Sequence, residues 1–144
     1  MMALHVTFRV GNASYAVAAA DVLHLESYDT ATHVPGAPAY VAGLVQVRGR
    51  LVPVVDLRVR FGLPAVEPTI DRRVVVIQVG ARVAGLLADS AREVVQLDDA
   101  AFERPPELIE RQAAGFVKAV ATVAKRMFLL VDLPRIIGEE LSHG

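Results

Sequence analysis

Histidine is the residue type in this chain best suited to bind a metal or to move a proton, and the histidines stand far apart. They are His5, His24, His33 and His143, and no two have the short spacing of metal ligands on one element. The chain has no cysteine, which excludes disulfides and thiolate metal sites. We therefore expect no metal and no cofactor, and we expect His5 and His143, near the two ends, to face solvent.

The acidic residues show no pattern typical of acid–base catalysis. Asp56 and Asp132 each follow an apolar run and precede a short segment with helical spacing, which is typical of a helix N-cap. The sequence also lacks the G-x-S-x-G, H-E-x-x-H and phosphate-binding Gly-Lys motifs. The chain is therefore predicted not to be an enzyme, and a binding module remains.

One charged residue lies in an otherwise apolar stretch. It is Arg48, between Val47 and Gly49, and the glycine tolerates the positive φ with which a chain can reverse. Arg48 is either a solvated turn arginine, the common case, or a surface anchor for a partner or a neighbouring loop. Arg58 and Arg60 make the next segment partly basic, and we interpret Arg60 as part of a solvated helix face.

The stretch around this arginine predicts a hairpin followed by a short helix. Leu44–Val47 and Leu51–Val55 are rich in β-branched residues, as buried strands are. Pro53 cannot donate to a strand ladder, so we expect it at a sheet edge or a bulge. Asp56 then caps a helix over Leu57–Phe61, which a glycine ends.

The composition favours a densely packed β protein. The 144 residues suffice for one domain, residues 1–144, or two small subdomains with a shared core, and 53% of them are hydrophobic. A net charge of −1 gives no electrostatic case for nucleic acid. No apolar run approaches the roughly 18–20 residues that span a bilayer, and the first residues lack a signal-peptide pattern. We expect a cytoplasmic protein without membrane insertion.

A weak internal repeat indicates two similar halves. Val54–Gly62 and Leu130–Gly138 both read as the end of a strand, an aspartate cap, a short helix and a glycine. The second helix is predicted over Leu133–Leu141. Two small closed barrels explain this repeat better than one open sheet, because closure removes the exposed edges of so many apolar strands.

The order and spacing of these motifs resemble the CheW-like domain family, the coupling proteins of bacterial chemotaxis arrays. Val34–Arg58 contains a P-x-x-P element, a G-x(4)-R-G element and the run P-V-V-D-L. Val83–Asp89 reads V-A-G-L-L-A-D, close to the V-G-L-x-V-D of the family's second lobe, and Phe128–Leu133 reads F-L-L-V-D-L. The resemblance covers most of the chain.

This resemblance implies a mainly β fold of two intertwined five-stranded SH3-like β-barrels, with short helices and a C-terminal helix. It implies an adaptor that bridges the cytoplasmic tip of methyl-accepting chemoreceptors and the regulatory domain of a CheA-type histidine kinase. Paralogous CheW-like domains are further candidate partners. The kinase contact would be mainly apolar, and the receptor's helical hairpin would lie near a groove between the barrels.

The resemblance also implies a site around the R-G arginine, which falls on Arg48. Family members commonly place an acidic residue opposite it, and here that position is His24. Glu26, two residues on, projects to the same face of an extended strand, so we expect an Arg48–Glu26 contact. This departure leaves open an adaptor of a non-flagellar kinase pathway, in surface motility or biofilm signalling. The predicted partner-binding residues are Arg48, Gly49, His24, Glu26, Val47 and Arg58.

Overall fold

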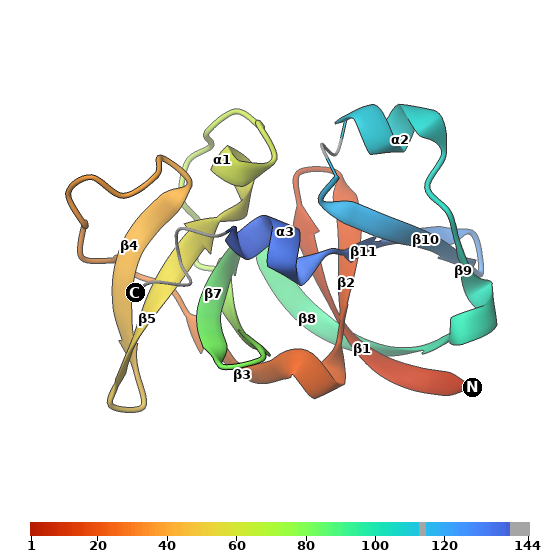
Figure 1. The fold of residues 1–144 in the computed structure, drawn as a ribbon, viewed down its shortest axis with the longest axis horizontal. Helices are drawn as coiled ribbons and strands as arrows, with labels where there is room; N and C mark the ends of the chain where they lie inside the picture. Colours follow the sequence, from red (N-terminus) through yellow and green to blue (C-terminus); the bar gives the residue numbers. More distant parts are fainter. Residues whose placement is uncertain (113–114, 139–144) are drawn as a thin grey trace.

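The computed structural model describes residues 1–112 and 115–138 of the chain. These residues form two curved β-sheets that lie side by side (Figure 1). We call them the six-stranded lobe, with strand order β8-β1-β2-β11-β10-β9, and the five-stranded lobe, with order β3-β6-β7-β5-β4. The strands are β1 (Met2–Val10), β2 (Ala13–Ala18), β3 (Val22–Ser27), β4 (Val41–Val47), β5 (Arg50–Asp56), β6 (Arg73–Val79), β7 (Arg82–Ala88), β8 (Ser90–Asp98), β9 (Phe102–Glu103), β10 (Val117–Val123) and β11 (Arg126–Val131). The helices are η1 (Ala19–Asp21), α1 (Leu57–Arg60), η2 (Asp99–Ala101), α2 (Glu107–Gln112) and α3 (Leu133–Ile137).

The two lobes are intertwined along the chain. Strands β1 and β2 begin the six-stranded lobe, β3 to β7 build the five-stranded lobe, and β8 to β11 return to the first. The predicted fold of two barrel-like sheets with short helices is confirmed. One sheet has six strands instead of five, because the two-residue strand β9 adds to its edge through Glu103 and Phe102.

The internal repeat corresponds to a structural repeat. Asp56 accepts hydrogen bonds from the backbone N–H groups of Arg58 and Val59 at the start of α1, and Asp132 accepts one from Arg135 in α3. The backbone N–H of Asp56 donates to the carbonyl of Tyr40 at 2.7 Å, and that of Asp132 donates to the carbonyl of Phe116 at 2.8 Å. Each of these aromatic residues precedes the hairpin that leads to the aspartate. Both caps are therefore confirmed. Helix α3 ends at Ile137, before the predicted end at Leu141, because Gly138 follows it with a φ of 74°. Residues 139–144 lie outside the described part of the chain.

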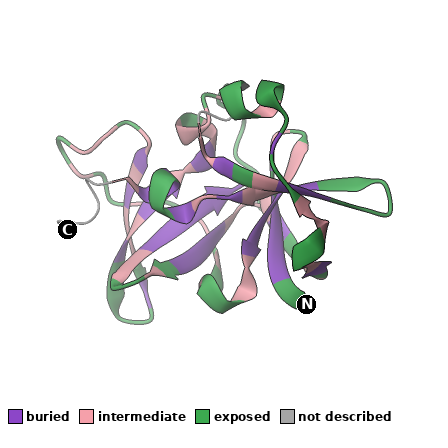
Figure 2. Ribbon diagram, turned by 45° about the vertical axis from the view of Figure 1, so that its right-hand side comes forward, coloured by how far each residue is buried: buried purple, intermediate pink, exposed green. Residues whose placement is uncertain are grey.

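The main hydrophobic cluster lies where the lobes meet (Figure 2). Val6 and Phe8 of β1 share this cluster with Val75 and Ile77 of β6. On the opposite face of β1, His5 and Thr7 are buried as well, because they point into the six-stranded lobe, so the prediction that His5 faces solvent is wrong. The imidazole is 4% exposed and lies 5.4 Å from the Phe102 ring, while His143 is outside the described residues.

Pro53 lies inside a sheet, although we expected an edge or a bulge. Strand β5 is between β4 and β7, and Pro53 stands opposite Leu44. Leu44 exchanges both of its backbone hydrogen bonds with Thr32, each at 2.8 Å, so it offers none to Pro53. The pairing with β7 begins one residue later, at Val54. The missing N–H of Pro53 therefore interrupts no ladder. The Thr32–Leu44 bridge also covers the outer edge of β4.

Candidate partner-binding surfaces

The β4–β5 hairpin presents Arg48 at its tip. Val47 pairs with Arg50, so Arg48 and Gly49 form a two-residue turn with φ angles of 51° and 79°. Positive φ at both central residues is typical of a type I′ turn, whose twist matches that of the two strands. The conformation is free for Gly49 but costs Arg48 roughly 1–2 kcal/mol. The hairpin register therefore holds the Arg48 backbone in place, and its side chain is 70% exposed.

Glu26 supplies the acidic partner of Arg48. The Arg48 Nε lies 3.7 Å from the Glu26 Oε1, which confirms the predicted contact as an ion pair longer than a normal hydrogen bond. Both side chains are accessible to water, so the pair contributes about 0–1 kcal/mol to stability. Glu26 and His24 are half-buried on one face of β3, and the residue between them, Leu25, is exposed. Glu26 also lines a shallow hollow with Val47. We call His24, Glu26, Arg48 and Gly49 the turn surface. Val47, which was also predicted to bind a partner, is only 7% exposed and packs in the hydrophobic cluster of the five-stranded lobe, so its contact with a partner stays a prediction.

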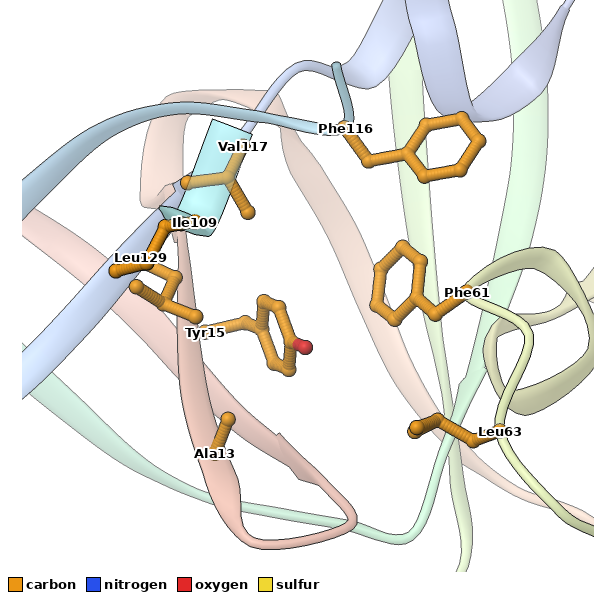
Figure 3. Close-up of a pocket in the computed structure, with 8 residues that line it drawn as sticks. All are labelled: Ala13, Tyr15, Phe61, Leu63, Ile109, Phe116, Val117 and Leu129. Atoms are coloured by element: carbon orange, nitrogen blue, oxygen red, sulfur yellow. The ribbon is translucent and has the colours of Figure 1, made fainter. Parts of the chain in front are cut away.

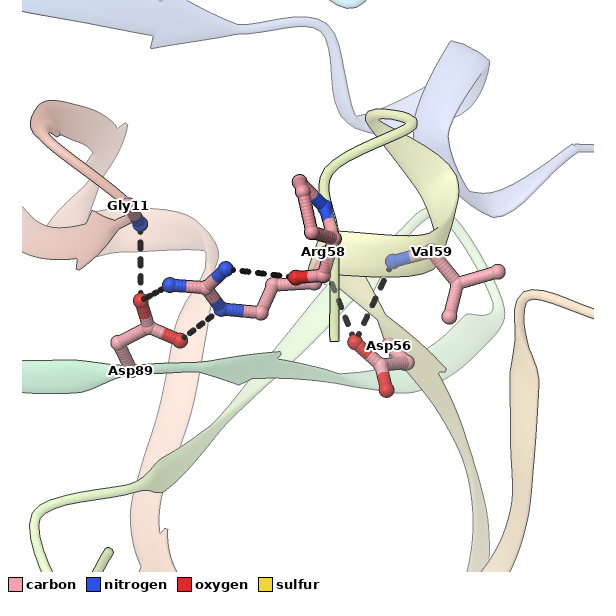
Figure 4. A network of polar contacts seen from close by, with 6 residues as sticks. Gly11, Asp56, Arg58, Val59 and Asp89 are labelled. Atoms are coloured by element: carbon pink, nitrogen blue, oxygen red, sulfur yellow. Dashed lines mark hydrogen bonds and ion pairs between the residues drawn. The ribbon is translucent and has the colours of Figure 1, made fainter. Parts of the chain in front are cut away.

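Arg58 lies apart from the turn surface, at the other end of β5. Its Nε and Nη2 donate to the two carboxylate oxygens of Asp89 at 2.9 and 2.7 Å, and its Nη1 donates to the carbonyl of Pro64 at 2.9 Å (Figure 4). The side chain is 18% exposed. The structure therefore uses the guanidinium of Arg58 within the molecule. A contact of Arg58 with a partner stays a prediction.

Asp89 is the centre of this polar network. Its Oδ2 also accepts the backbone N–H of Gly11 at 2.8 Å. Burial has the largest single effect on the carboxyl group and would raise its pKa. The hydrogen bonds from Arg58 and Gly11, with the nearby positive charges of Arg58 and Arg72, outweigh burial, so the pKa of Asp89 lies below its ordinary value of 3.8. The carboxylate is therefore ionised at neutral pH.

The interpretation of Arg60 as a solvated helix residue is wrong. Its Nε donates to the carbonyl of Ile136 and its Nη2 to that of Arg135, both at 2.9 Å. These carbonyls belong to the last turn of α3, where no intrahelical partner is present. The guanidinium also lies 3.7 Å from the centroid of the Tyr40 ring and 4.9 Å from that of Phe116. Arg60 thus joins α1 to α3, the equivalent helix of the other lobe.

An apolar hollow of about 220 Å³ lies between the lobes. Phe61 and Leu63, which follow α1, approach it from one side, and Tyr15 faces them from the six-stranded lobe (Figure 3). The Tyr15 and Phe61 rings are 5.1 Å apart, and Phe61 and Phe116 are 5.6 Å apart. Burial raises the pKa of Tyr15, so its hydroxyl is neutral at physiological pH. We call this hollow the apolar groove, and its lining residues are Ala13, Tyr15, Phe61, Leu63, Ile109, Phe116, Val117 and Leu129.

Sequence reasoning missed the residues of the apolar groove, although a signal for part of it was present. In the internal repeat, Asp56 corresponds to Asp132, and the same offset places Tyr40 opposite Phe116. These aromatic residues precede the two hairpins, and both contact Arg60. An extension of the repeat toward the N-terminus would have identified the pair. Nothing local in the sequence indicates that Phe61 and Tyr15 meet across the two lobes.

The described residues form candidate binding surfaces and contain no cluster of potential metal ligands. Within residues 1–112 and 115–138, no group of three or more histidine, aspartate or glutamate side chains could hold a metal ion. Over the same residues, no helix has the length and apolar character to cross a bilayer.

Comparisons with known proteins agree with the motifs. The model of the CheW-like domain matches residues 4–141. The Chemotaxis protein CheW of Rhizobium meliloti is 33% identical over 135 residues, which cover 94% of this chain and 87% of that protein. The Chemotaxis protein CheW of Bacillus subtilis is 27% identical, with 96% of this chain and 89% of that protein covered. The crystal structure of the scaffolding protein TtCheW from Thermoanaerobacter tengcongensis superposes with a TM-score of 0.84 at 26% identity, and covers 92% of this chain and 90% of that one.

Proposed function

Because this chain belongs to the CheW-like domain family, we propose that it is a non-catalytic adaptor that couples chemoreceptors to a sensor histidine kinase. The observation that carries the proposal is the family match over residues 4–141, which includes both lobes and the segments between them. In this proposal the chain works in the cytoplasm, at membrane-proximal receptor arrays. One surface binds the tip of a methyl-accepting chemoreceptor and another binds the regulatory domain of a CheA-type kinase.

The apolar groove suits the receptor tip. A helical hairpin binds through an apolar stripe, and helix-in-groove recognition requires a preformed apolar cleft. The groove offers aromatic walls from both lobes and one neutral phenol, that of Tyr15. Aromatic residues with a polar tip are typical anchors at such interfaces because they combine apolar area with one hydrogen bond.

The turn surface suits the kinase regulatory domain. Arg48 stands on a two-residue turn, and Leu51, near the start of the following strand β5, is 65% exposed. An exposed leucine and an exposed arginine on one hairpin provide the apolar and charged contacts that interfaces favour. The exposed ion pair with Glu26 leaves Arg48 accessible to a second acidic partner. Paralogous CheW-like domains share the fold of the kinase domain in this proposal and would compete for the turn surface.

Two titrations test the proposal, one with the receptor tip and one with the kinase regulatory domain. Leu63→Lys places a charge in the groove wall and should weaken receptor binding at least tenfold, with the kinase titration unchanged. Leu108→Lys is the matched control, because Leu108 lies on α2, is 66% exposed and does not line the groove. Equal loss in Leu63→Lys and Leu108→Lys would contradict the groove assignment. Absence of binding of the wild-type chain to either partner would contradict the proposed function.

The choice of kinase domain decides the pathway. Regulatory domains of every CheA-type kinase in the same genome should be titrated in parallel. The tightest binding to the kinase of flagellar chemotaxis supports the main proposal. The tightest binding to the kinase of a surface-motility or biofilm system supports the alternative that the His24 departure leaves open.

A further inference from the structure

We propose that Asp89, acting through Arg58 and Gly11, is the positioning residue that fixes the two lobes against each other and thereby sets the width of the apolar groove. The inference about the lobes depends on the structure alone. Its consequence for receptor binding rests on the proposed function.

Asp89 stands where the chain passes from one lobe to the other. It is the residue between β7, in the five-stranded lobe, and β8, in the six-stranded lobe. Its backbone N–H donates to the carbonyl of Arg9 at 2.9 Å, so the crossing point is already attached to β1. The side chain extends into the space between the lobes and is 28% exposed.

The carboxylate connects one segment of each lobe. The Gly11 N–H belongs to the β1–β2 turn of the six-stranded lobe and donates at 2.8 Å. The Arg58 guanidinium belongs to α1, which follows β5 of the five-stranded lobe, and it donates to both carboxylate oxygens at 2.9 and 2.7 Å. A bidentate pair of this kind fixes orientation as well as distance. Arg58 also donates to Pro64, so the loop after α1 is attached to the same guanidinium.

The attached segments lead directly into the walls of the groove. Ala13 comes two residues after Gly11, and Phe61 comes three residues after Arg58. Leu63 precedes Pro64 and faces the opposite turn, because a Cβ added at Gly11 would lie 3.5 Å from its Cδ1, which is van der Waals distance. The two walls therefore come close together at the end of the groove where the Asp89 network lies. A change in this network would move both walls.

Other ion pairs of the described residues lack this combination of burial and position. Arg126 and Glu93 form a bidentate pair at 2.9 and 3.0 Å, but β11 and β8 belong to one sheet and both side chains are about half exposed. Arg92 and Asp71 connect the two lobes, yet both are exposed and neither lines the groove. Glu93→Gln is therefore a matched control for Asp89→Asn: the same chemistry is removed, within one lobe.

The first measurement is the distance between the lobes in the free protein. The chain has no cysteine, so spin labels at L51C on β5 and L4C on β1, both exposed, report one distance by pulsed electron paramagnetic resonance. We expect Asp89→Asn to broaden or shift this distance distribution and Glu93→Gln to leave it unchanged. An unchanged distribution in Asp89→Asn would overturn the inference. If Asp89→Asn does not fold, Arg58→Lys keeps the charge, loses the bidentate geometry and should shift the distance in the same direction.

The second measurement is receptor-tip affinity, with kinase-domain affinity as the internal reference. Asp89→Asn should weaken receptor binding about tenfold and leave kinase binding within twofold, because the turn surface is at the far end of β5. A folded variant with an altered interlobe distance and unchanged receptor affinity would overturn the assignment to the groove. If the wild-type chain binds no receptor tip, the proposed function fails, and the distance measurement alone decides whether Asp89 positions the lobes.

Discussion

Replacing Arg60 with alanine should destabilise the protein far more than removing an ordinary surface arginine. The guanidinium donates two hydrogen bonds to backbone carbonyls at the end of α3, each at 2.9 Å. Hydrogen bonds to a charged group contribute about 1.5–3 kcal/mol when buried, and partial exposure of these two lowers the value to about 1 kcal/mol each. The ring contacts with Tyr40 and Phe116 add about 1 kcal/mol. We therefore expect a loss of about 2–4 kcal/mol.

Urea unfolding followed by circular dichroism measures this loss, with Arg48→Ala as the control. Arg48 is 70% exposed and its ion pair is long, so its removal should cost less than about 1 kcal/mol. For a chain of this length, a loss of about 3 kcal/mol lowers the melting temperature by roughly 6–12 °C. Arg60→Lys should recover little of the loss, because an ammonium cannot stack on the rings and reach two carbonyls. Equal stability of Arg60→Ala and Arg48→Ala would refute the assignment of Arg60 as a link between α1 and α3.

Three further predictions concern the core, the turn surface and the Asp89 network. Val55→Asp should prevent folding, because Val55 is fully buried and an unpaired buried charge costs several kcal/mol. Val59→Asp, on the exposed side of α1, is its control. An unchanged melting temperature of Val55→Asp would contradict the core assignment. Arg48→Glu should weaken kinase-domain binding at least tenfold and leave the melting temperature within about 2 °C of the wild-type value. A large decrease in melting temperature would show instead that Arg48 has a structural role. The pKa of Asp89 is lowered on folding, so its ion pair stabilises the protein above the unfolded pKa and loses this effect as the pH falls through the lower folded pKa. Wild type should therefore lose stability more steeply than Asp89→Asn as the pH decreases from about 5 through 3, and parallel curves would show that the carboxylate contributes nothing to acid sensitivity.

Local patterns in the sequence predicted the elements well. The Asp56 and Asp132 caps, the tight turn predicted at Arg48–Arg50 and the repeat of hairpin and helix depend on neighbouring residues. The structure contains each of them, with the turn reduced to Arg48 and Gly49 because Arg50 already pairs with Val47. The Arg48–Glu26 contact followed from the family resemblance, which places position 24 opposite the R-G arginine, together with strand periodicity, which puts side chains two residues apart on one face. These features need no knowledge of how the two lobes pack.

The errors for His5 and Arg60 concern residues whose surroundings come from the inside of a barrel or from the other lobe. His5 was expected to face solvent because it lies near the start of the chain, but one face of β1 points to the neighbouring lobe and the other to the barrel interior, so His5 is buried. Arg60 seemed to be an exposed helix residue until α3 was placed beside it. The apolar groove likewise depends on segments far apart in the sequence, such as Tyr15 and Phe61.

Recruitment of the kinase regulatory domain to immobilised receptor tips tests the adaptor proposal most directly. The kinase domain should be retained when the wild-type chain is present and lost when the chain is omitted. Neither Leu63→Lys nor Arg48→Glu should retain the kinase domain. Leu63→Lys should not bind the receptor tips, and Arg48→Glu should bind the tips but not the kinase domain. Retention of the kinase domain without the chain, or displacement of the receptor by the kinase domain, would contradict a chain that holds both partners at once.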